Sequence, residues 1–250
     1  MPKKHVIVVA GGRGARFGGA EPKQLLLLNG KPVLLHAMEC FFACDSSLSM
    51  VLALPEALMD RWRDAVRRYA VSAPHALVAG GATRFHSVQN ALSAIDGDGD
   101  GDGLVAVHDG VRPLVSSATI AACFEAAARE GAAVPVTPLT DSIRQVAPDG
   151  ASVAVKRENF CAVQTPQAFR LDVLRKAYEQ EFRSDFTDDA SVVESAGYRV
   201  ALVAGNTENI KITRPEDFIF AQAMVAAMGS QSSGVPGGNA KNEEKNEEKF

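Results

Sequence analysis

Short apolar runs typical of buried strands alternate along this chain with longer runs whose apolar residues recur at helical spacing. A helical pattern follows each of the first four strand-like runs. Strands that alternate with helices in this way predict an α/β fold, with a mostly parallel sheet covered by helices on both faces. The strand-like runs are HVIVVA (5–10), SMVLALP (49–55), HALVAG (75–80), LVAVHDG (104–110) and AAVPV (132–136).

The alternation breaks between positions 139 and 160, where the chain reads LTDSIRQVAPDGASVAVKRENF. Two short stretches flank Pro148, Asp149 and Gly150, which form a turn signal because proline fixes φ and glycine accepts a left-handed conformation. The segment 139–160 is therefore predicted to be a β-hairpin inserted into the α/β domain.

The C-terminal patterns predict two helices, a strand and a last helix. Helical spacing returns at 171–182 and 188–196, and YRVALVAG (198–205) is a strand pattern. Thr213 and Glu216 have the spacing of a capping box, which would open a final helix containing FIFAQAMVAAM.

A chain of 250 residues can form one large α/β domain or two small ones, and we expect a single domain over residues 1–228. The segment GDGDGDG (97–103) lacks the glutamate that closes an EF-hand loop, so a flexible acidic connector is favoured over a calcium site. Residues 229–250 are polar and of low complexity, with NEEK occurring twice, and are expected to be disordered.

Composition argues against several classes of protein. The net charge of -4 is unlike that of a nucleic-acid binder. No apolar run approaches the ~20 residues that span a bilayer, and MPKK leads into a strand pattern rather than the long apolar region of a signal peptide. The four cysteines show no metal spacing, which favours free thiols in a reducing compartment. We expect a cytoplasmic protein that binds neither nucleic acid nor membrane.

The first strand pattern ends in a loop that is rich in both glycine and positive charge. The stretch AGGRGARFGGAEPKQ (10–24) has five glycines within nine positions, together with Arg13, Arg16 and Lys23. It matches neither the P-loop, GxxxxGK[ST], nor the dinucleotide fingerprint, GxGxxG. One interpretation is a glycine-rich turn with solvated charges. The other is a phosphate site, because glycines let backbone amides approach a phosphate while the cations offset its charge.

The same loop resembles the signature loop of sugar-phosphate nucleotidyltransferases of the cytidylyltransferase type. HDGVRP (108–113), TPQAF (165–169), TDDASVVE (187–194) and NIKITRPED (209–217) then occur in the order seen in the 2-C-methyl-D-erythritol 4-phosphate cytidylyltransferase family. The resemblance implies a Rossmann-like sheet and a homodimer. It also implies transfer of CMP from CTP to methylerythritol phosphate with release of pyrophosphate, in the non-mevalonate isoprenoid pathway. The implied cofactor is Mg²⁺, for which another divalent cation could substitute.

The resemblance assigns catalysis to cations. The reaction is an in-line attack of a substrate phosphate oxygen on the α-phosphorus of CTP, so positioning and charge stabilisation carry most of the catalysis. Arg16 and Lys23 lie where the family places its catalytic cations, and Lys211 is the third cation expected there. Asp109 ends a strand pattern and is the expected Mg²⁺ ligand, with a helix cap as the alternative. Arg112 is expected to orient Asp109 or contact a phosphate, with a structural ion pair as the alternative.

The segment GGATRFHSV (80–88) resembles the part of the family that binds the base. A pocket of backbone groups can distinguish cytosine from uracil, because the exocyclic amine of cytosine donates a hydrogen bond where the uracil oxygen accepts one. Ala82 departs from the family, which often has an acidic residue at this position. The expected nucleotide-binding residues are Ala10, Gly11, Gly12, Gly14, Gly80, Gly81, Ser87 and Asp109.

A second group of residues is expected to bind the polyol phosphate, with cations for its phosphate and hydroxyls for its other oxygens. The hairpin 139–160 is implied to hold the homodimer together, so that Arg157 contacts the substrate in the partner's site. Ser142 stands where threonine is common in the family, and Val9 and Phe17 stand where proline and methionine are usual. The expected substrate-binding residues are Asp109, Arg112, Asp141, Ser142, Arg157, Thr165 and Lys211.

Three other functions fit parts of the pattern. A cytidylyltransferase acting on ribitol 5-phosphate would share the fold and the chemistry, although Asp141, Arg157 and NIKIT favour methylerythritol phosphate. A CMP-sugar synthetase is more distant because its substrate arm differs. A nucleotide-binding module without turnover is the remaining alternative, which is disfavoured by the presence of Arg16, Lys23, Asp109 and Lys211.

Overall fold

The computed structural model describes residues 2–11, 17, 21–95 and 103–232, the last four of these by their backbone alone. Gly12, Gly14 and Arg16 lie outside the described residues, as do most of the acidic connector and the tail from residue 233. The roles and properties predicted for these segments therefore remain predictions.

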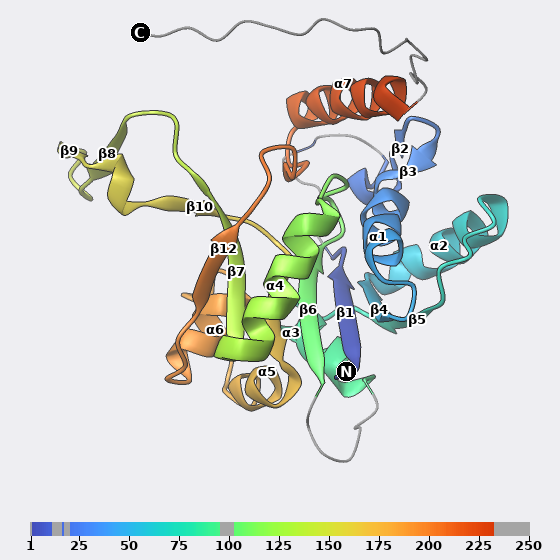
Figure 1. The fold of residues 1–250 in the computed structure, drawn as a ribbon, viewed down its shortest axis with the longest axis horizontal. Coiled ribbons are helices and arrows are strands. Elements are labelled where there is room, and N and C mark those ends of the chain that lie inside the picture. The colour runs from blue at the N-terminus through green and yellow to red at the C-terminus, as the bar shows by residue number, and fades with distance from the viewer. Residues whose placement is uncertain (1, 12–16, 18–20, 96–102, 233–250) are drawn as a thin grey trace, which may run out of the picture.

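A central sheet of eight strands runs through the described chain (Figure 1). Its strands are β1 (Lys4–Val9), β4 (Ser49–Leu54), β5 (His75–Ala79), β6 (Leu104–Asp109), β7 (Ala132–Pro138), β10 (Cys161–Val163), β11 (Gln167–Arg170) and β12 (Ala201–Ala204). They follow the order β5-β4-β1-β6-β11-β7, and both β10 and β12 pair with β7. The pairs of β1 with β4 and β6, of β4 with β5, and of β12 with β7 are parallel. The predicted mostly parallel sheet is confirmed, and the sequence missed only the antiparallel β10 and β11.

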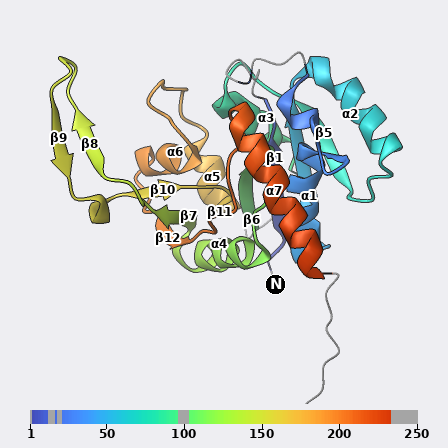
Figure 2. The same cartoon turned by 90° about the horizontal axis from the view of Figure 1, so that it is seen from above.

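Helices cover both faces of this sheet, as predicted (Figures 1 and 2). They are α1 (Val33–Cys44), α2 (Glu56–Arg68), α3 (Arg84–Ser93), α4 (Ser117–Glu130), α5 (Leu171–Ala177), α6 (Asp189–Ser195) and α7 (Pro215–Ser232). Residues of α1, α2 and α4 form the core on one face, and residues of α3, α5 and α6 form the core on the other. α5 is shorter than the predicted helix 171–182, and α7 extends past the predicted end at 228. No helix within the described residues is both long enough and apolar enough to cross a membrane.

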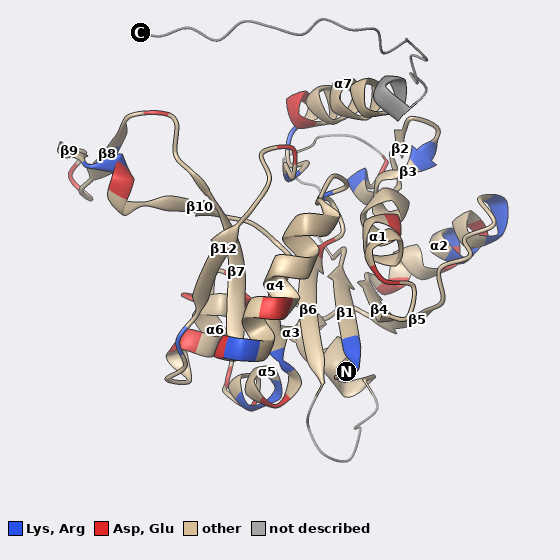
Figure 3. Ribbon diagram, in the orientation of Figure 1, with Lys and Arg blue, Asp and Glu red and all other residues tan. Residues whose placement is uncertain are grey.

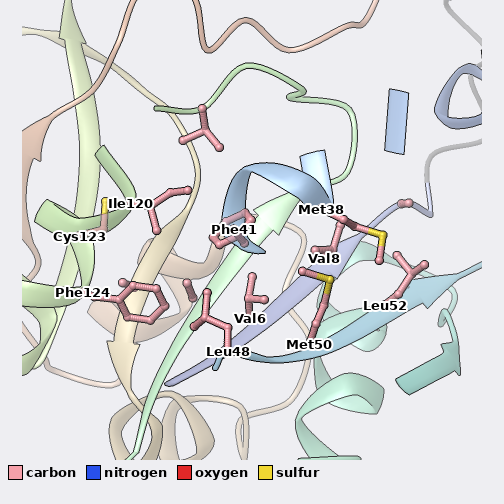
Figure 4. Close-up of a cluster of buried hydrophobic side chains, with 14 of the residues drawn as sticks. Val6, Val8, Met38, Phe41, Leu48, Met50, Leu52, Ile120, Cys123 and Phe124 are labelled. Carbon is pink, nitrogen blue, oxygen red and sulfur yellow. The ribbon is translucent and has the colours of Figure 1, made fainter. Parts of the chain in front are cut away.

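The two faces have separate hydrophobic cores because successive residues of a strand point to opposite sides of the sheet. On β1, Val6 and Val8 belong to the core with α1 and α4, whereas Ile7 and Val9 belong to the core with α3, α5 and α6. Figure 4 shows Phe41 of α1 beside Val6 in the first of these cores. A strand that is buried on both faces holds its carboxyl end in a fixed place. Figure 3 shows that charged residues lie mainly on the helices and on the segment between β7 and β10, rather than on the central strands.

The final helix packs over a small hairpin that the sequence did not predict. β2 (Leu27–Leu28) and β3 (Lys31–Pro32) pair antiparallel as a sheet of their own. Leu28 shares a hydrophobic cluster with Ala221 of α7 and with Ile212, which precedes this helix. The packing places the segment before α7 next to the carboxyl ends of the central strands.

The cap of the final helix differs from the predicted one. α7 starts at Pro215, and Oδ2 of Asp217 accepts the backbone N–H groups of Thr213 and Arg214 at 2.8 Å each. The predicted capping box of Thr213 and Glu216 is therefore wrong by one residue. Proline takes the first helical position, where its missing N–H costs nothing, and this moves the capping carboxylate to Asp217.

The segment between β7 and β10 extends away from the sheet as an arm (Figures 1 and 2). β8 (Ile143–Val146) and β9 (Ser152–Val155) pair antiparallel in a separate two-stranded sheet, and Gly150 has φ +86° in the turn between them. The predicted β-hairpin is confirmed. Val146 is 67% exposed and Val153 is 60% exposed, so the described residues of this chain leave apolar surface of the arm uncovered.

Candidate active site

The carboxyl ends of β1 and β6 open onto a pocket of about 230 Å³. Ligands of open α/β sheets bind at this edge, in the crevice outside the ends of the strands. The ends of the glycine loop, the turn of the predicted base-binding segment, HDGVRP and NIKITRPED all contribute to it. Its lining residues are Val9, Ala10, Gly11, Lys23, Gln24, Gly81, Ala82, Thr83, Arg84, Ser87, Asp109, Val111 and Lys211.

Asp109, the last residue of β6, is a buried carboxylate surrounded by three cations. Its Oδ2 lies 3.0 Å from Nζ of Lys211 and 3.2 Å from Nε of Arg112, and its Oδ1 lies 3.7 Å from Nε of Arg84. Burial by itself would raise the pKa of Asp109, but attraction to the three cations outweighs burial and holds the pKa well below its usual range. The carboxylate is ionised at neutral pH, and the surplus of cations favours an anionic ligand.

A buried chain of hydrogen bonds fixes the backbone of Asp109. Its N–H donates to Oγ1 of Thr165 at 3.0 Å, and this hydroxyl lies 3.0 Å from Nδ1 of His108. Nε2 of His108 donates to the carbonyl oxygen of Arg112 at 3.0 Å, since a carbonyl can only accept. Burial lowers the pKa of His108 to about 4, so the ring is neutral at pH 7. Thr165, predicted to bind substrate, lies outside the pocket lining, and its hydroxyl is already bonded within this chain.

Gln24 joins the two ends of the glycine loop, and Lys23 ties the C-terminal end of the loop to the segment before α7. They lie in the short helix η1 (Lys23–Leu25), where Nζ of Lys23 donates to the carbonyl of Ile212 at 3.0 Å. Nε2 of Gln24 donates to the carbonyl of Ala10 at 2.9 Å. Gln24 is buried, and its Oε1 has no hydrogen-bond partner within the described residues. Sequence reasoning did not select Gln24, although it ends the quoted loop stretch.

The turn before α3 forms another wall of the pocket. Oγ of Ser87 donates to the carbonyl of Thr83 at 2.9 Å and accepts the N–H of Gly81 at 3.0 Å. A Cβ on Gly81 would lie 2.3 Å from the Cβ of His86, so only glycine fits there. Ser87, predicted to contact the nucleotide, lines the pocket and also holds the shape of this wall.

Arg84 is a pocket residue that sequence reasoning missed. Its Nη1 and Nη2 donate to Oδ1 and Oδ2 of Asp189 at 2.7 Å and 2.6 Å. Asp189 belongs to TDDASVVE, a motif that the sequence singled out without giving it a role. The motif was a usable signal, but its partner lies 105 positions away and could not be identified from spacing.

Asp141, Ser142 and Arg157 lie outside the pocket that the described residues of their own chain form. The first two precede β8, and Arg157 begins the short helix η2 (Arg157–Asn159) after β9, so all three lie at the end of the hairpin opposite its turn. The Arg157 guanidinium donates to the carbonyl of Thr140 and lies 3.7 Å from the carboxylate of Glu158. The structure thus gathers these three residues on the arm and not around Asp109.

Comparison with known proteins decides the family. The chain matches the sequence model of the family described as 2-C-methyl-D-erythritol 4-phosphate cytidylyltransferase over residues 4–227. The chain belongs to this family. The family inferred from five separate motifs is therefore confirmed.

Curated relatives and solved structures carry the same name or a synonym. The 2-C-methyl-D-erythritol 4-phosphate cytidylyltransferase of Phocaeicola vulgatus is 47% identical over 222 residues, which are 89% of this chain and 99% of the relative. The crystal structure of the enzyme of that name from Thermus thermophilus has a TM-score of 0.69 at 32% identity, covering 90% of this chain and 100% of that one. The 4-diphosphocytidyl-2C-methyl-D-erythritol synthase of Anaerococcus prevotii has a TM-score of 0.76 at 27% identity, covering 90% and 99%. The Rossmann-like fold class is confirmed.

Several departures of this cytidylyltransferase from the family pattern lie at or beside the pocket. Val9 and Ala82 line it. Phe17 packs against the cluster that contains Val111, another lining residue. Because Ala82 has no carboxylate, Asp109 is the one acidic side chain among the described lining residues.

Proposed function

We propose that this chain transfers the CMP group of CTP to 2-C-methyl-D-erythritol 4-phosphate and releases pyrophosphate. The observation that carries the proposal is the surplus of positive charge around Asp109, where Lys211 and Arg112 contact the carboxylate and Lys23 lines the same pocket. Such a pocket between the ends of a glycine loop suits a nucleoside triphosphate. The names of the relatives supply the identity of the second substrate.

The triphosphate and the base of the nucleotide contact different walls of the pocket. The triphosphate lies against the glycine loop, where Lys23 and Arg16 offset its charge. The base lies against the turn that contains Gly80 and Gly81. Backbone groups in this turn pair with the exocyclic amine of cytosine, and uracil presents an acceptor at the same place.

The reaction needs electrostatic stabilisation more than proton transfer. An oxygen of the methylerythritol phosphate attacks the α-phosphorus of CTP, and the bond from that phosphorus to the bridging oxygen of pyrophosphate breaks. The attacking monoester is mostly dianionic at pH 7, since its second pKa is about 6, and so needs no general base. Lys23, Lys211 and Arg16 stabilise the charge that develops on the phosphoryl oxygens. This assignment leaves the neutral, buried His108 a structural role.

Among the described pocket residues, Asp109 supplies one carboxylate oxygen that could bind a divalent cation. Asp109 is the acidic side chain that lines the pocket, and its Oδ2 is occupied by Lys211 and Arg112. Within the described residues, its Oδ1 has an ion pair with Arg84 but no hydrogen bond, because 3.7 Å is too long for one. A single carboxylate oxygen together with triphosphate oxygens is a usual way to hold Mg²⁺. We assign Asp109 this role; when bound, Mg²⁺ or another divalent cation would offset charge on the triphosphate.

The arm supports the proposal of a homodimer. A two-stranded ribbon is marginally stable alone, so this one needs a partner surface. Val146 and Val153 on the ribbon and Phe160 and Val163 after it are all exposed, which supplies apolar area for such a contact. A second copy would also explain why Arg157 lies outside the pocket of its own chain. In the proposed dimer, Arg157 contacts the substrate phosphate in the partner's pocket.

Pyrophosphate release tests the function. The protein is incubated with CTP and Mg²⁺ together with methylerythritol phosphate, ribitol 5-phosphate or no acceptor. The proposal predicts rapid release of pyrophosphate only in the sample that contains methylerythritol phosphate as the acceptor. Release with ribitol 5-phosphate at an equal rate would favour the rival cytidylyltransferase, and tight CTP binding without release would favour a binding module.

A further inference from the structure

Arg84 presents one edge of its guanidinium to the pocket. Each of its terminal nitrogens donates one N–H to Asp189, and Nε is the guanidinium nitrogen paired with Asp109, whose Oδ1 lies 3.7 Å from it. The side chain of Arg84 is 29% exposed and lines the pocket, whereas Asp189 is 0% exposed. Asp189 therefore reaches the pocket only through the arginine.

We propose that Asp189 is a positioning residue for the nucleotide: it locks Arg84 so that the Nε–H edge meets a phosphate oxygen of bound CTP. The inference rests on the proposed function, because it takes CTP as the ligand of this pocket. It gives the TDDASVVE motif a role in nucleotide binding, although none of its residues lines the pocket.

The backbone of Asp189 is tied to the central sheet. Gln167 of β11 donates from Nε2 to Oδ2 of Asp188 at 2.8 Å, and its Oε1 accepts the N–H of Ala190 at 2.9 Å. These bonds hold the residues on both sides of Asp189. β11 pairs with β6, the strand that ends in Asp109. The first turn of α6 and the pocket carboxylate are thus fixed to neighbouring strands.

Tyr178 restrains both partners of the ion pair. Its hydroxyl donates to Oδ1 of Asp189 at 2.6 Å, and its ring stacks on Phe85, the neighbour of Arg84, with centroids 4.6 Å apart. Phe186 also stacks on Phe85, with centroids 5.8 Å apart. Burial raises the pKa of Tyr178 well above its ordinary value, so the hydroxyl keeps its proton and remains a donor. Both oxygens of Asp189 are therefore bonded.

The negative charge of Asp189 indicates that the ion pair serves to orient Arg84 and not to strengthen its attraction for CTP. A carboxylate bonded to both terminal nitrogens offsets much of the charge of Arg84, which weakens its pull on a triphosphate. An arginine that served only to attract CTP would bind it more tightly without that carboxylate. A buried ion pair also adds little net stability compared with apolar residues of similar size. The pair instead supplies a donor edge that is fixed beside Asp109.

Orientation and simple charge predict opposite results for Asp189→Asn. If Asp189 acted only through its charge, the variant would bind CTP more tightly. If it positions Arg84, the Kd of CTP should rise at least about tenfold, because breaking a buried charge pair at a binding site costs at least that much. The KM of the polyol phosphate should change less than about threefold. Isothermal titration of the full chain with CTP and Mg²⁺, together with steady-state kinetics, measures both quantities.

Two further variants separate positioning from general damage to the fold. Tyr178→Phe keeps the ring stack and loses one hydrogen bond to Asp189, and it should raise the Kd of CTP about threefold even if Asp189→Asn does not fold. Asp172→Asn is the matched control, because it makes the same change in an exposed ion pair with Arg170 at the start of α5, a pair that includes neither Arg84 nor Asp189. It should bind CTP within about twofold of wild type, since exposed ion pairs contribute little.

A double-mutant cycle tests whether Asp189 affects CTP binding through Arg84. In an Arg84→Gln background, adding Asp189→Asn should change the Kd of CTP by less than about twofold, because the residue through which Asp189 acts is gone. Unchanged or tighter CTP binding by folded Asp189→Asn, or an equal loss in Asp172→Asn, would overturn the positioning role. Failure of the wild-type protein to bind CTP would overturn the proposed function instead.

Discussion

The Nζ of Lys211 lies 3.0 Å from Oδ2 of Asp109, so the segment that leads into α7 is held against the end of the central strand β6. Lys23 reaches the same segment, because its Nζ donates to the carbonyl of Ile212. Lys23 and Lys211 are the two described lysines predicted to be catalytic. The backbone contact of Lys23 at Ile212 therefore lies next to Lys211 in the chain.

Lys211→Ala is expected to lower turnover by about 10²–10³-fold, because it removes a cation aimed at charge that develops in the transition state. The melting temperature should change little, since Asp109 keeps its other cations. Pyrophosphate release and thermal melting measure the two effects. Lys176→Ala, which breaks an exposed pair with Glu179, is the matched control and should turn over like wild type. Near-normal turnover of Lys211→Ala would rule out the catalytic role.

Lys23→Ala and Arg16→Ala should each cause a loss of turnover of the same order, for the same electrostatic reason. Lys31→Ala is a suitable control, because Lys31 is exposed and pairs with Glu39. Single-turnover kinetics with saturating CTP would separate the chemical step from binding. If either pocket variant keeps a normal single-turnover rate, that residue is not a catalytic cation.

The pocket should prefer CTP over UTP and ATP. Uracil inverts one hydrogen bond at the turn that contains Gly81, and a purine is larger than the cytosine for which the turn is proposed. Competition between the three nucleotides at low concentration, followed by pyrophosphate release, measures the selectivity. Equal kcat/KM for CTP and UTP would contradict the assignment of the turn to the base.

Burial of His108 should make stability depend on pH. Its pKa is about 4 in the folded protein and about 6.5 in the unfolded chain, so the unfolded chain takes up the proton first as the pH falls. The stabilisation is fully present above about pH 6.5 and is lost towards about pH 4, on the order of 3 kcal/mol from this group. Urea unfolding across this range should show a smaller loss for His108→Gln than for wild type. Identical losses would show that His108 is not held neutral.

The sheet was predictable because a strand buried on both faces leaves a local signature. Val6 to Val9 form a continuous apolar run in the sequence, and apolar residues of the helical runs recur at helical spacing. β11 had no such signature, because its four residues include the buried polar Gln167, whose bonds to α6 form only in the folded chain. Sequence therefore recovered the layers of the fold, and missed the two antiparallel strands of the central sheet and the small hairpin of β2 and β3.

The site was predictable to the extent that its residues belong to recognisable motifs. Asp109, Lys23 and Lys211 line one pocket as their motifs suggested. Arg84 and Gln24 were missed, because a role for either depends on partners distant in sequence. Spacing along a chain does not reveal which buried carboxylate will face which arginine.

Subunit mixing tests the proposal that Arg157 acts in the partner's pocket. Inactive Lys23→Ala protein is mixed with inactive Arg157→Ala protein under conditions that exchange subunits. If Arg157 acts across the dimer, each heterodimer has one pocket with both residues intact, and activity returns. If Arg157 acts within its own chain, every pocket of the heterodimer lacks one residue, so inactivity despite proven exchange would contradict the proposal.

The fate of the α-phosphorus of CTP tests the central claim most directly. CTP labelled at that phosphorus is incubated with the protein, Mg²⁺ and methylerythritol phosphate, and the products are separated. The account predicts that the label moves into a cytidyl diphospho derivative of the polyol, with an equal amount of unlabelled pyrophosphate. Label that stays in CTP, or that appears as free CMP, would contradict it.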